Sequence, residues 1–554
     1  MYQPKSFGVF KDLPGYFKKG TWLKDLIAGI IVAIIALPLS IALAISSGVS
    51  PEKGLITAFI AGFCISFFGG SDVQIGGPTG AFVVIICGII AGYGIDGLII
   101  STLMAGIFLI LFGVFKLGNV IKYIPYTITV GFTTGIAVTL MFTQVNDLLG
   151  LNIANIPSEF IPKWGAYFAN LSNINWWAAF IGILTIAISF LWPKINKKIP
   201  GSLIALIVTT AIVIIFKIPV NTIETQFGEI SGKLPLPTLP PLSIDKIISL
   251  LSPAFTIALL AAIESLLSAV VADGMTGKKH DSNAELIGQG IANVAVSFFG
   301  GIPATGAIAR TAANIKNGGK TPMAGIIHAV TLFLIMLIFM PYAKLIPMST
   351  LAGILVVVSY NMAEIKSMKT LLKSSKSDAL VMMVTFILTV IFDLVVAIEI
   401  GMILALVLIV MKVSENTTVK ESSVIDSEKY KNDKIMIYEI NGPLFFGAAS
   451  NFIDVLGDIN TKLNIVIFDM SKMTVMDATA HDALTKIEKR CRAEHILPMF
   501  VGVQEQPLKI ISNLGGYEGI KKEMFFESID EAYIEAESIV ELNKKVKAKG
   551  NKKQ

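Results

Sequence analysis

The stretch Ser66-Phe67-Phe68-Gly69-Gly70 recurs in the chain as Ser297-Phe298-Phe299-Gly300-Gly301, 231 residues later. After each copy comes a Pro- and Gly-rich element that opens an apolar segment. The first element reads Gly76-Gly77-Pro78-Thr79-Gly80-Ala81, and the second reads Ile302-Pro303-Ala304-Thr305-Gly306-Ala307. Two matched elements in the same order indicate an internal repeat rather than a chance match within an apolar chain.

The composition around this repeat indicates a membrane protein. The chain has 554 residues, of which 54% are hydrophobic and 15% are charged, and its mean hydropathy is +0.72. Soluble proteins carry about 25% charged residues because a folded surface must stay wetted. The deficit argues against a disordered chain, a nucleic-acid-binding surface as the main activity, and an ordinary soluble enzyme. The net charge of +5 is small, so the positions of the charges matter more than their sum.

Apolar runs separated by short turns fill the chain as far as Lys412. Several runs are shorter than the ~20 residues that a full span needs, which is typical of the broken helices of transporters. Basic residues up to Lys24 precede a first run that is long enough to span, so we expect an uncleaved first helix. The fourteen predicted segments are 26–46, 54–68, 79–92, 97–115, 126–145, 176–192, 201–216, 253–272, 287–300, 304–314, 323–341, 351–362, 378–393 and 395–412.

The lysines between these segments give the chain an orientation. With a cytoplasmic N-terminus, the inside connections hold thirteen lysines and the outside connections hold six, spread over longer loops. This bias follows the positive-inside rule, so we expect both termini in the cytoplasm and the chain in the cytoplasmic membrane. The copies of the repeat end segments two and nine, so each repeat has seven segments. An odd number inverts the second copy, which predicts a 7 + 7 inverted-repeat transporter with repeats at about 26–216 and 253–412.

The Pro- and Gly-rich elements predict two half-helices that begin near the middle of the membrane. Proline suits a first helical turn, whose backbone N–H groups lack intrahelical partners and carry the positive end of the helix dipole. Inversion points the starts at Thr79-Gly80-Ala81 and Thr305-Gly306-Ala307 toward each other. Two converging helix N-termini of this kind form an anion site. The alternative is that both elements are kinks that permit close helix packing.

Two ionisable residues lie within the apolar segments and are candidates for function. Arg310, early in the second half-helix, would add positive field to the anion site, or it would snorkel to the cytoplasmic surface. Glu264, in the middle of its segment, could bind a coupling proton, bind Na⁺ or pair with Arg310. Ser268, one turn further along, is a plausible oxygen neighbour. The alternative for Glu264 is a structural hydrogen bond between helices.

No other chemistry is indicated by the sequence. Gly319-Lys320-Thr321 imitates the end of a phosphate-binding loop, but Asn314 stands where that loop needs glycine. The three cysteines and four histidines show no metal-ligand or disulfide spacing, and no hydrolase motif is present. We therefore expect neither an enzyme nor a cofactor or resident metal.

Beyond a linker at 413–433, the alternation of hydrophobic residues becomes strand-like. Ile435–Ile440, Ile465–Asp469 and Met499–Val503 are predicted strands, with helices at about 447–460 and 478–493 between them. This order predicts a small α/β domain over 434–545 and a Lys-rich tail over 546–554. We expect the residues beyond Glu541 to be frayed.

Gly77-Pro78-Thr79-Gly80-Ala81, Glu264 and Arg310-Thr311, together with this tail, make the chain resemble the SulP family of anion transporters. The resemblance covers essentially the whole chain. It implies that core segments one to four and eight to eleven move against a scaffold in an elevator-like cycle. It also implies a STAS domain in the tail and a homodimer. By position, Thr79 and Thr305-Gly306-Ala307 match the family's substrate site, and Glu264 matches its cation-coupling carboxylate.

Departures from the family pattern bear on the substrate. Pro38-Leu39-Ser40 replaces the Pro-Gln-Gly of sulfate-type members, and Glu264 with Ile308 replaces the Asp and Thr of sodium-coupled bicarbonate members. The missing hydroxyl favours H⁺ coupling or exchange over Na⁺. Gly442-Pro443-Leu444-Phe445-Phe446 is closer to the C4-dicarboxylate branch.

The sequence thus predicts a secondary active transporter of sulfate or bicarbonate, with a C4-dicarboxylate/H⁺ symporter as the alternative. An anion channel and a membrane regulator acting through the STAS domain are alternatives from other classes. Thr479 occupies the place of a phosphorylatable serine in STAS relatives, but the small glycine that should follow it is absent.

Overall fold

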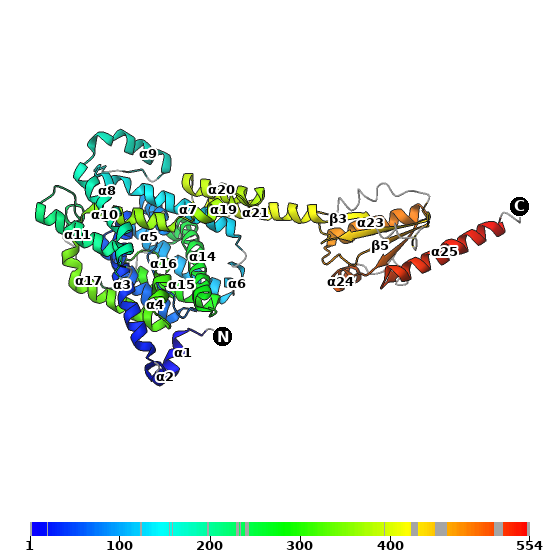
Figure 1. Cartoon of the computed structure of the whole chain (residues 1–554), viewed down its shortest axis with the longest axis horizontal. Helices are drawn as coiled ribbons and strands as arrows, with labels where there is room; N and C mark the ends of the chain where they lie inside the picture. Colours follow the sequence, from blue (N-terminus) through cyan, green and yellow to red (C-terminus); the bar gives the residue numbers. More distant parts are fainter. Residues whose placement is uncertain are drawn as a thin grey trace. The chain divides into compact units, whose positions relative to one another are not determined.

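A computed structural model describes most of the chain as two compact units, Met1–Met402 and Ile403–Gln554 (Figure 1). The predicted boundary lay about ten residues further along the chain, at 412/413. The described residues are 3–18, 20–121, 124–153, 156–157, 159, 160–196, 199–228, 232, 234–238, 243–392, 394–422, 430, 432–448, 463–514 and 524–550.

The first unit is built from helices that pack into a bundle (Figure 1). The helices that cover the predicted segments are α3 (Thr21–Ser46), α4 (Pro51–Phe68), α5 (Phe82–Val114), α7 (Tyr126–Thr143), α10 (Trp176–Ile195), α11 (Gly201–Phe216), α14 (Leu251–Thr276), α15 (Ser282–Phe298), α16 (Ile308–Lys316), α17 (Pro322–Ala343), α18 (Met348–Met362), α20 (Lys376–Ile391) and α21 (Leu394–Asn416), whose residues from Ile403 onward belong to the second unit. The short ones are α1 (Ser6–Lys11), α2 (Leu13–Lys18), α6 (Gly118–Ile121), α8 (Val145–Leu149), α9 (Phe160–Ala169), α12 (Ile223–Phe227), α13 (Ile244–Ser249) and α19 (Ile365–Leu371).

The chain is a polytopic helical membrane protein, as the sequence predicts. Within the described residues, nine helices are long and apolar enough to cross a membrane. The predicted segments 79–92 and 97–115 both fall in α5, which is interrupted at Gly94 by a backbone with φ 70° and ψ −174°. Each of the other predicted segments overlaps one long helix, except that 304–314 begins in extended chain and becomes helical only at Ile308. Helix α16 is too short to span a membrane, and it directly follows the extended element of the second repeat.

The two repeats hold each other's extended elements in a reciprocal way. Thr57 of α4, in the first repeat, accepts a hydrogen bond from the N–H of Ile302 in the second repeat at 2.8 Å. Glu285 of α15, in the second repeat, accepts one from the N–H of Gly70 in the first repeat, also at 2.8 Å. Both interactions are buried and lie between helices that pack together. The inverted repeat is therefore held by polar contacts as well as by apolar packing.

The second unit is a five-stranded sheet in the order β3-β4-β5-β6-β7. Its strands are β3 (Thr418–Glu421), β4 (Ile435–Asn441), β5 (Ile465–Asp469), β6 (Leu497–Val501) and β7 (Phe525–Phe526). All neighbours pair in parallel except β3 and β4. One face packs against α23 (Ala478–Ala493) and the other against α25 (Ile529–Gly550), while α24 (Glu505–Asn513) follows β6. The small α/β domain predicted from the sequence is present.

Two details of the tail differ from the sequence prediction. Residues 418–421, placed in a linker, form the edge strand β3, whose short polar sequence gave no strand signal. The tail beyond Glu541 was predicted to be frayed, but α25 continues to Gly550. Tyr533, Ala536 and Val540 bury one side of α25, and the lysines that follow are good helix formers. Most of the helix predicted at 447–460 lies outside the described residues.

Replacing Thr57 with valine tests the reciprocal contact between the repeats. The change keeps the side-chain shape but leaves the buried N–H of Ile302 without its acceptor, which should cost about 1–3 kcal/mol. We expect a lower thermal unfolding midpoint for the purified protein in detergent. Thr331→Val is the matched control, because the Thr331 hydroxyl donates to Ile327 O of its own helix. Equal midpoints for both variants would contradict the contact's role.

Candidate anion site

The two Pro- and Gly-rich elements meet at the centre of the first unit as a pair of short antiparallel strands. In β1 (Gly76–Gly77) and β2 (Thr305–Gly306), Gly76 lies opposite Gly306 and Gly77 lies opposite Thr305. Soon after each strand a helix begins, α5 at Phe82 and α16 at Ile308. The two elements therefore lie together as hydrogen-bonded strands, and each helix begins just after the predicted start, beyond Ala81 and beyond Ala307.

Glycine is required at this crossing because side chains approach the backbone closely. A Cβ atom on Gly306 would lie 1.5 Å from Nε2 of Gln74, and one on Gly77 would lie 2.5 Å from Nη1 of Arg310. Gly77 also has φ 146°, a conformation that L side chains rarely adopt. The glycines predicted from the repeat thus make room for two polar side chains beside the strands.

Glu264 of α14 is joined to the first half-helix. The Thr79 hydroxyl donates to Oε2 of Glu264 at 2.8 Å, and both side chains are partly buried. Thr79 and Glu264 were predicted separately, one as a substrate ligand and the other as a coupling carboxylate. Their hydrogen bond brings the two predicted functions to one place.

Arg310 points into the protein and not toward the surface. Arg310 is 4% exposed. Its Nη2 atom donates to the carbonyl oxygen of Pro78, and its Nη1 atom is buried without a hydrogen-bond partner. In the part of the chain that the structure describes, Arg310 forms no ion pair with Glu264, which accepts from Thr79 instead. The guanidinium therefore keeps donor capacity beside the crossing strands.

Other predicted residues are placed nearby but make different contacts. The Ser268 hydroxyl donates to Thr311 Oγ1 at 3.2 Å, so it is not an oxygen neighbour of the Glu264 carboxylate. The Thr305 hydroxyl donates to Ala261 O at 2.9 Å, which ties β2 to α14. The hydroxyls of Thr79 and Thr305 thus both donate within the protein, to Glu264 and to Ala261 O. The backbone N–H of Ala307, at the start of the second half-helix, donates to Ile75 O at 2.9 Å.

Apolar side chains lie over the start of the first half-helix. A Cβ atom on Gly80 would lie 2.7 Å from Leu140 of α7, 3.6 Å from Met362 of α18 and 3.9 Å from Leu43 of α3. Gly80 and Ala81 are buried, as are Thr305, Gly306 and Ala307. These neighbours keep water away from the helix start, which strengthens electrostatic interactions there.

Sequence reasoning missed Gln74 and Thr311. Gln74 Nε2 donates to Ser265 O at 3.1 Å, and Thr311 Oγ1 accepts from the N–H of Ile75 at 3.0 Å. Both residues join the strand β1 to helices of the second repeat. The sequence signal for these contacts was the position of two polar residues, Gln74 just before the first Pro- and Gly-rich element and Thr311 next to Arg310.

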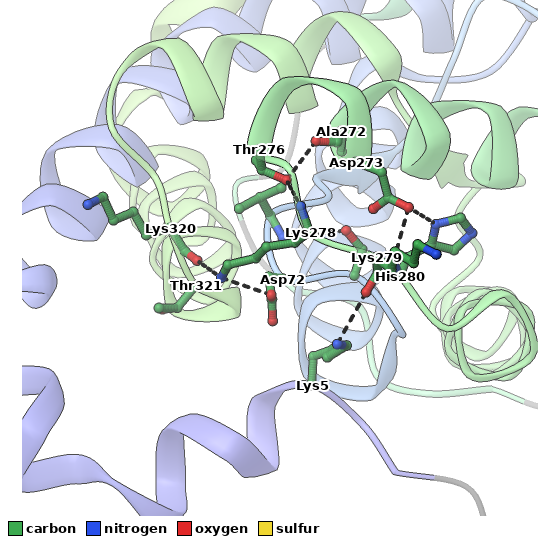
Figure 2. A network of polar contacts seen from close by, with 12 residues as sticks. Lys5, Asp72, Ala272, Asp273, Thr276, Lys278, Lys279, His280, Lys320 and Thr321 are labelled. Atoms are coloured by element: carbon green, nitrogen blue, oxygen red, sulfur yellow. Dashed lines mark hydrogen bonds and ion pairs between the residues drawn. The ribbon is translucent and has the colours of Figure 1, made fainter.

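A second polar network holds the end of α14 that was predicted to face the cytoplasm (Figure 2). Lys278 pairs with Asp72 at 2.9 Å and donates to Lys320 O at 3.4 Å, so it links the approaches to β1 and to α17. His280 Nδ1 lies 2.7 Å from Asp273 Oδ2. The network joins the turn after α14 to the chain before β1.

Two opposed half-helices, crossing strands between inverted repeats and ionisable side chains buried beside them define a membrane transport protein of the inverted-repeat class. Residues 22–385 match the sulfate permease family, and residues 426–532 match the STAS domain. The chain belongs to the sulfate permease (SulP) family and carries a C-terminal STAS domain, as the resemblance in the sequence predicted.

Relatives of this family are similar over nearly the whole chain. The "Putative sulfate transporter YvdB" of Bacillus subtilis is 43% identical over 92% of this chain and 96% of its own length. The "Bicarbonate transporter BicA" of Picosynechococcus is 30% identical over 92% and 93%. Among solved structures, that of SLC26A9 has a TM-score of 0.85 at 20% identity, covering 97% of this chain and 93% of its own. The BicA transmembrane domain has a TM-score of 0.63 at 33% identity, covering 69% and 97%.

Gly77→Ala tests whether the close approach of Arg310 matters for transport. An added Cβ would displace the guanidinium and strain a backbone at φ 146°. We expect anion uptake into proteoliposomes to fall at least about tenfold, as for other displaced binding groups, with normal elution on size exclusion. Gly88→Ala, on α5, is the control because nothing lies within 4 Å of its added Cβ. Unchanged uptake in Gly77→Ala would refute the requirement.

Proposed function

We propose that the protein is a secondary active transporter that moves sulfate or bicarbonate across the cytoplasmic membrane, with both termini in the cytoplasm. The observation that carries this proposal is the β1–β2 crossing, which sets two helix starts beside a buried Arg310 guanidinium. Helix N-termini and an arginine with an unpartnered N–H together favour a small anion. The printed names of the similar proteins, sulfate and bicarbonate transporters, agree with this class.

The substrate ligands in this proposal are the backbone groups at Thr79-Gly80-Ala81 and Thr305-Gly306-Ala307, just before the two helix starts, with Arg310. Their donors are fixed before the anion arrives, so binding requires little rearrangement. The apolar neighbours of Gly80 favour an anion that has lost part of its hydration shell. A C4-dicarboxylate is the alternative substrate, because its two carboxylate groups can accept hydrogen bonds from the two helix starts.

Glu264 is the proposed coupling residue, with H⁺ as the coupled ion or with anion exchange in its place. The carboxylate accepts from Thr79 and has no cationic partner among the described residues. Proton binding would alter its hydrogen bond to the half-helix that holds the anion. Ile308 supplies no oxygen for a sodium ion, which supports H⁺ over Na⁺. In this scheme Ser268 affects the coupling site only indirectly, through its hydrogen bond to Thr311.

Movement in the proposed cycle is elevator-like, and the protein works as a homodimer. Segments one to four and eight to eleven carry the site and would move as one body. The reciprocal contacts of Thr57 and Glu285 support this, because they join helices of both repeats inside that body.

Uptake into proteoliposomes tests the proposed function. We expect saturable uptake of labelled sulfate or bicarbonate that is faster when the outside is more acidic, and loss of the stimulation with a protonophore. Protein-free liposomes are the control. Uptake of succinate instead of both inorganic anions would assign the dicarboxylate alternative. If none of these anions moves, the proposed function is wrong.

Glu264→Gln tests proton coupling. The amide oxygen can still accept from Thr79, so the site should keep its shape while losing its titratable group. We expect anion binding within about twofold of the wild type, since a retained neutral hydrogen bond differs little in net free energy. The stimulation by an acidic outside should disappear. Glu399→Gln, at an exposed carboxylate, is the control. Persistent stimulation in Glu264→Gln would show that another group carries the proton.

A further inference from the structure

A small polar cavity, lined by none of the candidate anion-site residues, lies at the ends of helices predicted to face outward. Its volume is about 10 Å³, close to the space that one water-sized body needs. The oxygen-bearing side chains that line it come from four separate parts of the chain: Asp147, Asn152, Asn175, Asn221 and Ser349.

Asp147 places a carboxylate in this cavity without a basic partner. It lies in α8 and accepts a hydrogen bond from Asn146 Nδ2 at 2.9 Å. Among the described residues, no lysine, arginine or histidine forms an ion pair with it. A partly buried carboxylate attracts a cation or loses its charge.

Ser349 independently points to a ligand in the same cavity. It lies in the first turn of α18, is 1% exposed, and its hydroxyl oxygen has no hydrogen-bond partner. A buried hydroxyl without a partner is costly, and it is satisfied when an ion or water occupies the cavity. Asp147 and Ser349 thus line one small space from different helices.

The asparagines frame this space and open it to the surface. Asn221 Nδ2 donates to Asn152 Oδ1 at 2.5 Å, and both residues are exposed. Asn175 caps α10, because its side-chain oxygen accepts from the N–H groups of Trp177 and Ala178. These bonds fix the walls of the cavity and leave the Asn221 side-chain oxygen as a further ligand.

We propose that this cavity binds a sodium ion, held by the Asp147 carboxylate, the Ser349 hydroxyl and the Asn221 side-chain oxygen. Hard cations prefer oxygen ligands of these kinds. A single carboxylate is neutralised by one monovalent ion, whereas a divalent ion would leave a net positive charge in a poorly hydrated place. The exposed asparagine pair gives the ion a route from solvent.

The bound ion would fasten together parts of the proposed scaffold. Asp147 follows α7, Asn175 begins α10, Asn221 precedes α12 and Ser349 begins α18. Met348 N already donates to Asn221 O at 2.9 Å, and Asn175 N donates to Leu149 O at 3.0 Å. The sodium ion would add a charge-based link to these backbone contacts. It takes no part in the coupling at Glu264.

Thermal unfolding of the full-length protein in detergent tests the proposal. At constant ionic strength, NaCl should raise the unfolding midpoint above that in N-methylglucamine chloride, and the shift should saturate with Na⁺ concentration. Asp147→Asn should abolish the shift. In sodium-free buffer this variant should be at least as stable as the wild type, since it removes an uncompensated carboxylate. Glu264→Gln should keep the full shift, which separates this site from the proposed transport mechanism.

Ser349→Ala is a second test of the sodium site that does not depend on the folding of the Asp147 variant. It keeps the charge and removes one ligand, so the Na⁺ concentration at half-maximal shift should rise at least about tenfold. An unchanged shift in Asp147→Asn, or no Na⁺ shift in the wild type, would overturn the proposal. A shift produced by CaCl₂ but not by NaCl would overturn the choice of ion. A shift lost in Glu264→Gln would place the sodium at the coupling residue instead.

Discussion

Backbone pairing between β1 and β2 is the constraint on which the membrane unit depends. In a bilayer, an extended chain is tolerated only where its N–H and C=O groups find partners inside the protein. The chain from Ser71 to Ala81 and the chain from Gly300 to Ala307 are both non-helical over most of their length. Pairing the two extended segments with each other, with Thr57 and Glu285 at their outer ends, satisfies both at once. Neither repeat could place its half-helix alone.

This arrangement explains how a chain with few charges can handle charged cargo. The crossing delivers two helix N-termini to one place, and their partial positive charges come from the backbone. Arg310 adds one full positive charge, and its guanidinium donates to the carbonyl oxygen of Pro78. The carboxylate of Glu264, on α14, accepts from Thr79 and forms no ion pair with Arg310 among the described residues. In the proposed function, keeping the two charges apart leaves the guanidinium available to an anion and the carboxylate available to a proton.

The sequence predicted the parts of this site whose signal is local. Runs of apolar residues gave the segments, and the repeated Pro- and Gly-rich elements gave the two helix starts and their inversion. It did not predict which hydroxyl meets which partner: Ser268 contacts Thr311, not Glu264, because a difference of one helical turn does not fix where a side chain points. The β3 strand was also missed, since an edge strand with a short polar sequence obtains its pairing from β4 and not from its own pattern.

An elevator-like cycle needs two rigid bodies, and the chain stiffens them by different means. The proposed core is joined by buried hydrogen bonds between repeats, which no aqueous ion can reach or exchange. The proposed scaffold meets solvent at its outer end, where α8, α10 and α18 pack together. There, among the described residues, Asp147 forms no ion pair with a basic residue and the Ser349 hydroxyl has no hydrogen-bond partner. A cation from solvent can complete that end because it is exposed, whereas a charge near the β1–β2 crossing would compete with the transported anion. The electrostatics of the site therefore favour a separation of the proposed sodium ion from the proposed anion path.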